Sequence, residues 1–274
     1  MKKKIIIIGF IIFFIGAGAF VYFGQKKNQQ KELTYSGTIE TTQAKLSFQV
    51  PGRVAQVHIQ EGQSVAKNQI IAELDRDEFA SRYDQTKANV TSVQETLKDT
   101  KKNYERFEEL FGKGVVTEKE RDTLKLAYEV AKSRLNESES ILNQASIRLG
   151  YTRLKSPMDG VVTSRNIEPG ETVNAGREVI TVSDLSRVDL KIFVDETEIG
   201  KVKPNQKVEV RVDTFPGKVY TGYVAFISPE GEFTPKIIQT KKERVKIVYL
   251  VKVSIVNPAF ELKAGMPADA LLTQ

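Results

Sequence analysis

The stretch GRVAQVHIQEGQSV at residues 52–65 returns in outline as GVVTSRNIEPGETV at residues 160–173. The offset is constant, 160 − 52 = 108 residues, and it joins Gly52 to Gly160, Val54 to Val162, Ile59 to Ile167, Gly62 to Gly170, and Val65 to Val173. Glycines between short runs of β-branched residues indicate tight turns that need a positive φ. The chain therefore contains two copies of one small β-unit.

Each copy continues into an apolar run that predicts a buried strand, IIAELD up to Asp75 and VITVSD up to Asp184. One copy alone cannot bury a whole face, so the two copies are expected to pack on each other as a flattened sandwich. We assign residues 41–75 to the first half of this domain and residues 151–185 to the second half. Residues 76–150 are then an insertion between the halves.

The insertion has the spacing of two long amphipathic helices. In each arm, steps of three and four residues alternate along one seam, as in a coiled coil. The first seam consists of Phe79, Tyr83, Thr86, Val90, Val93, Leu97, Thr100, Tyr104, Phe107 and Phe111. The second seam consists of Thr117, Arg121, Leu124, Tyr128, Ala131, Leu135, Ser138, Leu142, Ala145 and Leu149. Arms of about 33 to 36 residues joined by a short turn predict an antiparallel hairpin that reaches roughly 50 Å.

Polar residues mark the expected ends of both helices. Asp75 with Glu78, and Thr117 with Glu120, have the spacing of a capping box, in which first-turn side chains satisfy free backbone N–H groups. Gly150 is expected to end the second helix. The insertion is therefore predicted to have its own start and stop signals.

Residues 186–274 change to short alternating strands, which predict a small antiparallel β-barrel. The alternating apolar positions are Val188, Leu190, Ile192 and Val194, then Val208, Val210 and Val212, then Val245, Ile247, Tyr249, Val251, Val253 and Ile255. The segment from Asp195 to Val202 predicts one short helix. Residues 25–40 are assigned to a linker and a leading strand, which enters the sandwich or the barrel.

The net charge of +6 belongs to the N-terminus. Residues 1–31 hold six lysines and no acidic residue, so residues 32–274 carry +6 − 6 = 0. A neutral body does not attract the phosphates of nucleic acid. We therefore expect no nucleic-acid partner.

The run from Ile5 to Phe23 has 19 residues and no charge, which is long enough for a transmembrane helix. Three lysines precede it, so residues 1–24 are predicted to be a cytoplasmic tip and a single membrane anchor, with the rest of the chain exported. The alternative is a cleaved signal peptide, because Ala17-Gly18-Ala19 resembles a cleavage site. The apolar run is longer than the core of a signal peptide, which favours a retained anchor.

The sequence offers no constellation for catalysis. Cysteine is absent, which excludes thiolate nucleophiles and cysteine-based metal sites. The single histidine, His58, lies opposite Asn166 of the second copy, and neither convergent ligands nor an oriented base accompany it. Gly112-Lys113-Gly114 lacks the spacer and the following Ser or Thr of a phosphate-binding loop. We expect no enzyme activity, no metal site and no cofactor.

The two copies resemble the halves of a biotinyl or lipoyl carrier domain, split by a hairpin as in the membrane fusion protein family, the HlyD-like periplasmic adaptors. VDETEIGKVKPNQKVEVRVD at residues 194–213 and LKAGMPADALL at residues 262–272 resemble the β-barrel of these adaptors. The resemblance implies a mixed α+β, elongated chain with an N-terminal transmembrane helix, a lipoyl-like barrel-sandwich hybrid, an antiparallel coiled-coil hairpin at residues 76–150, and a β-barrel. The turn glycines of the lipoyl-like halves are then Gly52, Gly62, Gly160 and Gly170.

The hairpin tip carries a second resemblance. Arg106, Leu110 and Thr117 resemble the Arg, Leu and Ser, four and eleven positions apart, with which adaptors dock to TolC-like outer membrane channels. Threonine in place of serine keeps the hydroxyl and adds a methyl group. Arg106 and Leu110 share a face beside the seam, so Leu110 is expected to be partly exposed. Thr117 has an alternative role as helix cap, and the two roles can coexist.

The resemblance implies a periplasmic adaptor of a tripartite efflux or secretion system, anchored in the cell inner membrane with its body in the periplasm. It would link an inner membrane transporter to a TolC-like channel, as a homo-oligomer and in particular a hexamer. GEFTPKIIQTKKERVKIVYLVKV at residues 231–253 is similar to the branch paired with ABC-type exporters. The alternatives are a biotin- or lipoyl-type carrier subunit, although the Met-Lys-Met of a carrier is missing, and a membrane-tethered envelope scaffold without a transport role.

Overall fold

The structure is a computed structural model that describes residues 33–233 and 247–272. The predicted membrane anchor at residues 1–24 lies outside the described residues. Within the described ranges, no helix combines the length and the apolar character that a membrane span requires. The chain divides into two compact units, one of Met1–Thr42 with Leu185–Gln274 and one of Gln43–Asp184.

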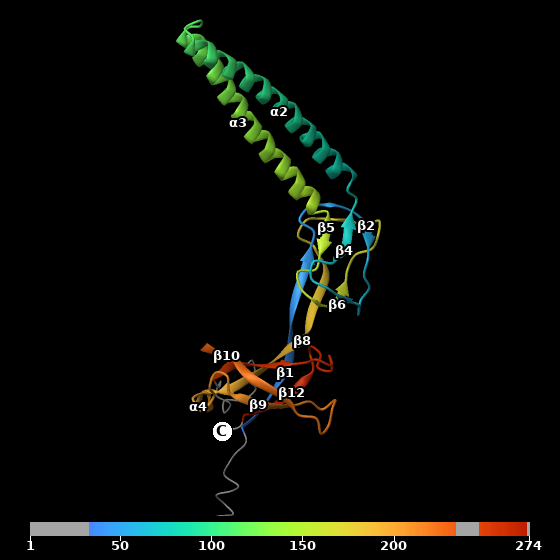
Figure 1. The fold of residues 1–274 in the computed structure, drawn as a ribbon. Helices are drawn as coiled ribbons and strands as arrows, with labels where there is room; N and C mark the ends of the chain where they lie inside the picture. Colours follow the sequence, from blue (N-terminus) through green and yellow to red (C-terminus); the bar gives the residue numbers. More distant parts are fainter. Residues whose placement is uncertain (1–32, 234–246, 273–274) are drawn as a thin grey trace, which may run out of the picture. The chain divides into compact units, whose positions relative to one another are not determined.

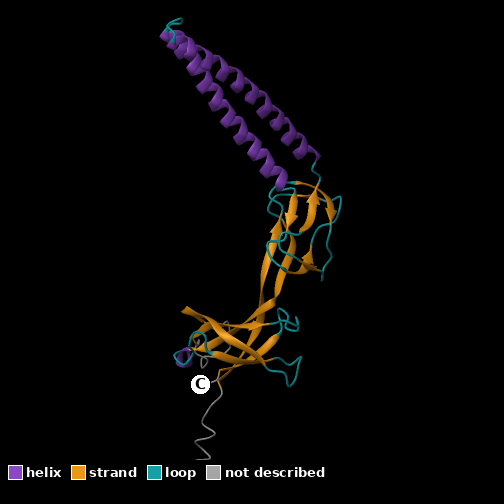
Figure 2. Cartoon of the chain, in the orientation of Figure 1, coloured by secondary structure: helices purple, strands orange, loops and turns teal. Residues whose placement is uncertain are grey.

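The β-sandwich of the unit Gln43–Asp184 has two layers (Figures 1 and 2). One layer is a sheet in the order β5-β4-β2-β7, and the other contains β3, β6 and the first part of β8. The strands of this unit alone are β2 (Gly52–Val57), β3 (Ser64–Val65), β4 (Ile70–Leu74), β5 (Arg153–Lys155), β6 (Gly160–Arg165) and β7 (Thr172–Val173). Two longer strands, β1 (Leu33–Ser47) and β8 (Glu178–Asp195), have residues in both units. Each layer mixes the two copies, because β2 of the first copy pairs with β7 of the second, and β3 pairs with β6.

Backbone hydrogen bonds between the copies repeat at the same offset of 108 residues. The N–H of Gly62 donates to the carbonyl of Val162 at 2.8 Å. Its counterpart, the N–H of Gly170, donates to the carbonyl of Val54, also at 2.8 Å. Bonds that are exchanged in this way relate the copies by an approximate twofold axis. The prediction that the two copies pack together is therefore confirmed.

Equivalent apolar residues of the two copies fill the space between the layers. The buried cluster contains Phe48, Val50, Val54, Ile59, Val65, Ile71, Ala72, Leu74, Leu154, Val162, Ile167, Val173, Val179, Ile180 and Val182. Every apolar position that defined the repeat is in this cluster. Removing such side chains from water is the main source of stability for a domain of this size, at about 25 cal/mol per Å² of apolar surface.

Two helices occupy the insertion, α2 (Asp77–Gly112) with 36 residues and α3 (Glu118–Gly150) with 33 residues. Figure 1 shows them side by side, joined at one end by the turn. They leave the sandwich from neighbouring strands, since β4 precedes α2, β5 follows α3, and β4 pairs with β5. Every predicted seam position is partly or fully buried except the exposed Thr117. The fully buried residues of α3 are small, Ala131, Ser138 and Ala145, which lets the helices approach closely.

The predicted capping box at the start of α2 is wrong. The N-cap is Arg76, and its side chain makes no capping hydrogen bond. Asp75 lies one residue too early to cap, and its carboxylate instead pairs with Arg53 at 3.3 Å and accepts the N–H of Asp77 at 3.3 Å. Glu78 is then the second helical residue, so it cannot reach back as a capping box requires. At the far end, α3 stops at Gly150 as predicted.

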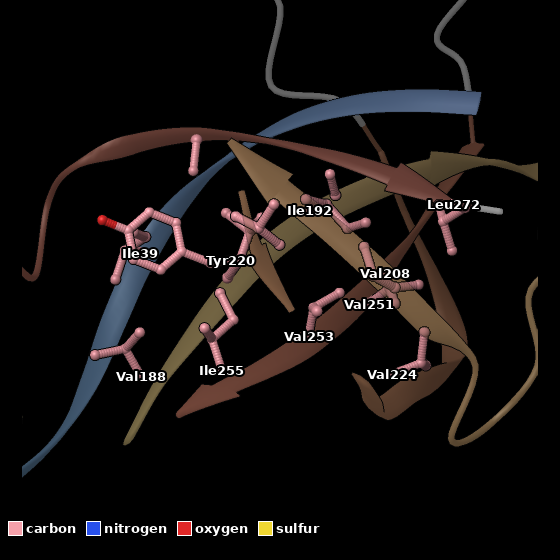
Figure 3. Packing of buried hydrophobic residues seen from close by; sticks show 14 of the residues in the cluster. Ile39, Val188, Ile192, Val208, Tyr220, Val224, Val251, Val253, Ile255 and Leu272 are labelled. Atoms are coloured by element: carbon pink, nitrogen blue, oxygen red, sulfur yellow. The ribbon is translucent and has the colours of Figure 1, made fainter. Parts of the chain in front are cut away.

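The other unit contains an antiparallel barrel whose strand order is β1-β12-β9-β10-β11-β8, closed by a pairing of β1 with β8. Its further elements are α4 (Glu196–Ile199), β9 (Lys207–Arg211), β10 (Tyr220–Phe233), β11 (Ile247–Val256) and β12 (Pro267–Leu272). Figure 3 shows side chains from these strands meeting inside the barrel, among them Ile192, Val208 and Val253. The short helix predicted between Asp195 and Val202 is present as α4.

The observed strands differ from the predicted ones in two details. The apolar run of the second copy does not stop at Asp184, because β8 continues without a break to Asp195. In β11, Val251, Val253 and Ile255 face the core as predicted, whereas Ile247 is exposed. The pairing of β11 with β10 is irregular between Val251 and Tyr249, where three residues of β10 lie opposite one residue of β11, so the alternation of faces is interrupted before Ile247.

Candidate functional site: the hairpin tip

The turn between α2 and α3 ends the first helix with a Schellman motif. Gly114 adopts φ +74°, a left-handed conformation that suits glycine. Its N–H donates to the carbonyl of Phe111 at 2.9 Å, and the N–H of Val115 donates to the carbonyl of Leu110 at 3.0 Å. These two bonds satisfy carbonyls that the end of a helix leaves free. The second glycine of the predicted break therefore fixes the geometry of the tip.

Thr117 starts α3 with the predicted capping box. The hydroxyl of Thr117 accepts the N–H of Glu120 at 3.4 Å and donates to the carboxylate of Glu120 at 2.7 Å. The same carboxylate accepts the N–H of Thr117 at 2.8 Å. Hydrogen bonds from the backbone and then the side chain of Thr117 lower the pKa of Glu120. The capping role of Thr117 is confirmed, and its hydroxyl proton is already used within the chain.

Two apolar side chains lie at the turn. Leu110 is partly buried, in agreement with the predicted partial exposure, and Val115 is 67% exposed. Hydrogen bonds hold the backbone of both residues, so their side chains lie on a turn with a fixed backbone. Val115 has the largest exposed fraction among the large apolar side chains that the structure describes. Its exposure was not predicted, because Val115 belongs to neither seam and only the turn geometry turns it outward.

Arg106 lies one helical turn before Leu110, and its side chain is exposed. Within residues 33–233 and 247–272, the side chain of Arg106 has neither a hydrogen bond nor an ion pair. Lys113, by contrast, lies at 2.5 Å from Glu109. The three residues of the sequence resemblance thus lie near the same turn, with a guanidinium that is free to bind an acceptor on another molecule.

A cluster around Arg121 joins the two helices beneath the turn. The guanidinium of Arg121 lies 4.3 Å from the centre of the Phe111 ring, a distance at which a cation–π contact is favourable. It also pairs with Glu118 at 3.3 Å, Asp122 at 2.7 Å and, across the hairpin, Glu108 at 3.9 Å. The hydrogen bond to Asp122 raises the pKa of Arg121 above its usual value. The sequence placed Arg121 on the seam, although nothing in its spacing revealed this network.

The stack of Tyr104 on Tyr128 continues the contact further down the hairpin. The ring centres are 5.8 Å apart and the planes differ by 8°. Partial burial and the neighbouring Glu108 raise the pKa of Tyr104. Both rings belong to the predicted seams, so this end of the hairpin is held by side chains that the pattern identified.

The glycines predicted to form turns divide into two kinds. Gly62 and Gly170 are turn residues with φ +82° and +90°. Gly52 and Gly160 do not have a positive φ and instead begin β2 and β6, so their assignment to turns is wrong. A Cβ atom on Gly160 would lie 2.6 Å from the carbonyl oxygen of Ser183, which explains why only glycine fits there.

His58 follows β2 and is exposed, with Nε2 at 3.6 Å from a carboxylate oxygen of Glu73. In residues 33–233 and 247–272, no group of three or more His, Asp and Glu side chains has the arrangement of a metal site. The hairpin tip combines the exposed Val115 with the unpaired side chain of Arg106 beside a turn whose backbone is held by hydrogen bonds. Its chemistry is that of a contact surface.

Comparisons with known proteins agree with this architecture. The family model of the CzcB-like barrel-sandwich hybrid domain matches residues 42–184, and that of the YknX-like β-barrel domain matches residues 188–269. A UPF0194 membrane protein of Acidithiobacillus ferridurans is 27% identical, with 97% of this chain and 94% of that protein covered. MacA from Actinobacillus actinomycetemcomitans is similar in structure, with a TM-score of 0.62, 26% identity, and 89% and 79% of the two chains covered.

The membrane fusion protein Spr0693 from Streptococcus pneumoniae R6 has a TM-score of 0.69 over 88% of this chain and 99% of that one. At 16% identity, this likeness bears on the fold alone. The match to the barrel-sandwich hybrid model is the broader finding, because residues 42–184 are 143 of the 274 residues. The chain therefore belongs to the membrane fusion protein family.

Proposed function

We propose that the protein is a periplasmic adaptor that links an inner membrane transporter to a TolC-like outer membrane channel in an efflux or secretion system. The observation that carries this proposal is the helical hairpin. Its helices of 36 and 33 residues carry one turn roughly 50 Å away from the sandwich. A hairpin of this length adds nothing to the sandwich core, so its use lies in what the turn contacts.

The proposed location is the cell inner membrane, with a single N-terminal span and the described units on the periplasmic side. The apolar run from Ile5 to Phe23 and the lysines before it support this orientation. Relatives that match nearly the whole chain are named membrane proteins, which supports membrane association of this chain as well.

The proposed partners are a transporter, for which the family resemblance favours the ABC type, and further copies of the chain in a hexameric ring. We also propose that the two helices of the hairpin pack as a coiled coil, because steps of three and four residues alternate along their seams. The adaptor would bridge and seal without covalent chemistry, so we propose that it is not an enzyme and uses no cofactor. Crosslinking of intact cells followed by purification would recover both membrane partners, whereas recovery of neither would favour the envelope scaffold.

At the tip, we propose that Arg106 and Leu110 contact the channel directly. Arg106 offers N–H donors without a partner in the described part of the chain, and Leu110 offers an apolar surface beside them. Thr117 would serve the same contact by holding the turn, since its hydroxyl proton is donated to Glu120 at 2.7 Å. A fixed turn reduces the entropy lost on binding.

The experiment is the substitution Leu110→Asp, measured by export of a substrate and by crosslinking to the channel. The expected result is loss of both, because a carboxylate cannot be buried in an apolar contact without a partner. Helix content and membrane insertion should be unchanged, since Leu110 is only partly buried. The matched control is Ile147→Asp, an exposed apolar position at the other end of α3, where export should persist. Normal export by Leu110→Asp would rule out the docking role.

A further inference from the structure

The barrel carries a second unusual surface, on the outside of β8, β10 and β11. The register places Phe226 opposite Lys252, and Lys252 opposite Lys191, so these three residues form one row across the strands. Phe193 lies two residues after Lys191 on β8, and Tyr223 lies opposite Ser254, which is two residues after Lys252 on β11. Both side chains are on the same outer side of the sheet. We call these residues, with Arg187 opposite Val256, the outer barrel face.

Three residues of the outer barrel face are aromatic. Phe193, Tyr223 and Phe226 are 41%, 53% and 46% exposed. Val256 at the end of β11 is also exposed. Contiguous exposed apolar surface on a soluble domain marks a site of contact with another molecule or with a membrane.

The cations of this face are poorly compensated. Lys191 and Lys252 lie directly opposite each other on paired strands, an arrangement of like charges that destabilises a sheet. Lys191 lies 5.8 Å from the centre of the Phe193 ring and 3.6 Å from the carboxylate of Glu40. Lys252 and Arg187 have no ion-pair partner within the described ranges. An anion between Lys191 and Lys252 would remove the repulsion that the sheet otherwise contains.

We propose that the outer barrel face docks on an anionic phospholipid surface. The lysines would bind lipid phosphates, and the aromatic rings would enter the headgroup region, where Trp and Tyr are enriched in membrane proteins. Each basic residue near an anionic membrane raises the affinity for that membrane by about tenfold or less. Asp189, Asp195 and Glu40 are acidic on this side of the barrel, and Glu40 already pairs with Lys191, so Lys252 and Arg187 are the cations of the outer barrel face that lack an ion pair in the described ranges.

The length of the chain before the barrel favours a lipid surface over a distant partner. Nine residues, 24–32, separate the end of the apolar run at Phe23 from the start of β1 at Leu33. Even fully extended, such a segment spans at most about 30 Å. With the proposed anchor in the bilayer, the barrel cannot leave the neighbourhood of the membrane. This step rests on the proposed anchor, and the docking itself needs neither the transporter nor the channel.

The test uses the absence of tryptophan from the chain. Phe226→Trp in the full chain gives a single-tryptophan protein, which is reconstituted alone in lipid nanodiscs that contain brominated acyl chains. Discs of phosphatidylcholine are compared with discs that also contain phosphatidylglycerol. Leu126→Trp, at an exposed position of the hairpin, is the matched control for an exposed indole.

The expected result for the Phe226→Trp protein is bromine quenching and a blue shift of its indole emission in the anionic discs, with no quenching in the Leu126→Trp control. Adding Lys252→Glu should lower the ratio of docked to undocked protein about 30-fold, because it removes one cation and adds an anion. Lys132→Glu, the same change at an exposed position of α3, should have no effect.

Three results would overturn the proposal. The first is no quenching in either lipid, and the second is equal quenching in both lipids that Lys252→Glu does not alter. The third is a blue shift without quenching, which would mean that a second copy of the protein covers the face. Recovery of the chain with the discs reports on the anchor, and export reports on the adaptor role, so failure of docking is distinguishable from failure of the proposed function.

Discussion

The two ends of the unit Gln43–Asp184 are built from the same kinds of residue and use them in opposite ways. At the sandwich end, Ile59 and Ile167 are 108 positions apart, and both are buried. At the hairpin tip, Val115 is exposed, and Leu110 is only partly buried. Glycines fix the backbone at both ends, by close packing or turns in the sandwich and by the Schellman motif at the tip.

This difference separates residues that stabilise the fold from residues that are available to a partner. Apolar side chains of the sandwich remove each other from water, and their loss reduces the free energy of unfolding. Apolar side chains at the tip contribute little to stability, so their loss should act on binding. Substitutions at the two ends should therefore affect different measurements.

The largest effect is expected in the sandwich. Ile59→Ala and Ile167→Ala should each lower the free energy of unfolding by about 2–5 kcal/mol, because each removes buried methyl groups and leaves a cavity. The two values should be similar, since the residues are equivalent in the repeat. Urea unfolding measures both, and Ile147→Ala, at an exposed position, should change stability by less than about 0.5 kcal/mol. A large effect at only one of the two isoleucines would mean that the copies do not share one core.

The next effect distinguishes the copies. Gly160→Ala should cost about 1–3 kcal/mol, because the new Cβ meets the backbone oxygen of Ser183 at 2.6 Å and the backbone must move. At Gly52, the nearest atom is the side-chain Cδ1 of Leu74 at 3.2 Å, which can shift. Gly52→Ala should therefore be the milder of the two in thermal unfolding. The reverse order would contradict the close approach of β6 to β8.

A smaller effect is expected at the tip, from Thr117. Thr117→Ala should cost about 1 kcal/mol of helix stability, because the N-cap hydrogen bond to Glu120 is lost. Asparagine is also a good N-cap residue, so Thr117→Asn should keep both stability and export. Circular dichroism and an export assay test the pair. If Thr117→Asn folds normally but fails to export, Thr117 itself contacts the channel.

The smallest effect concerns pH and contrasts the turns of the two copies. A hydrogen bond from Arg165 lowers the pKa of Glu168, and one from Arg177 lowers that of Glu171. A carboxyl group whose pKa is lowered by folding stabilises the fold above its unfolded pKa, near 4.5, and this contribution is lost as the pH falls through the folded value. The first copy has Gln60 and Gln63 at these positions, which do not titrate.

The double substitution of Glu168 and Glu171 by glutamine should therefore flatten the decline of stability below pH 4.5, with little change near neutral pH. Thermal unfolding as a function of pH measures this. If the double variant loses stability at low pH as the unchanged protein does, other carboxylates cause this loss.

The sequence predicted the elements whose signal repeats over many residues. Matches at Gly62 and Gly170 revealed the duplication, and the seams revealed both helices, since each depends on many positions that agree. Single-residue features were less predictable. Asp75 had the spacing of a cap, but the N-cap is Arg76, one residue later, and the carboxylate of Asp75 pairs with Arg53. The exposure of Val115 followed from the left-handed Gly114, a conformation that the Gly-Lys-Gly sequence permits at either glycine.

The most direct test of the account places a photo-crosslinking amino acid at Val115, and separately at Ile147, in the full chain in intact cells. Both positions are exposed on the hairpin, one at the tip and one near the sandwich. The account predicts an adduct with an outer membrane channel from position 115 and none from position 147. Channel adducts from position 147 alone, or no adduct with a second protein from position 115, would contradict the claim that the hairpin tip makes the contact.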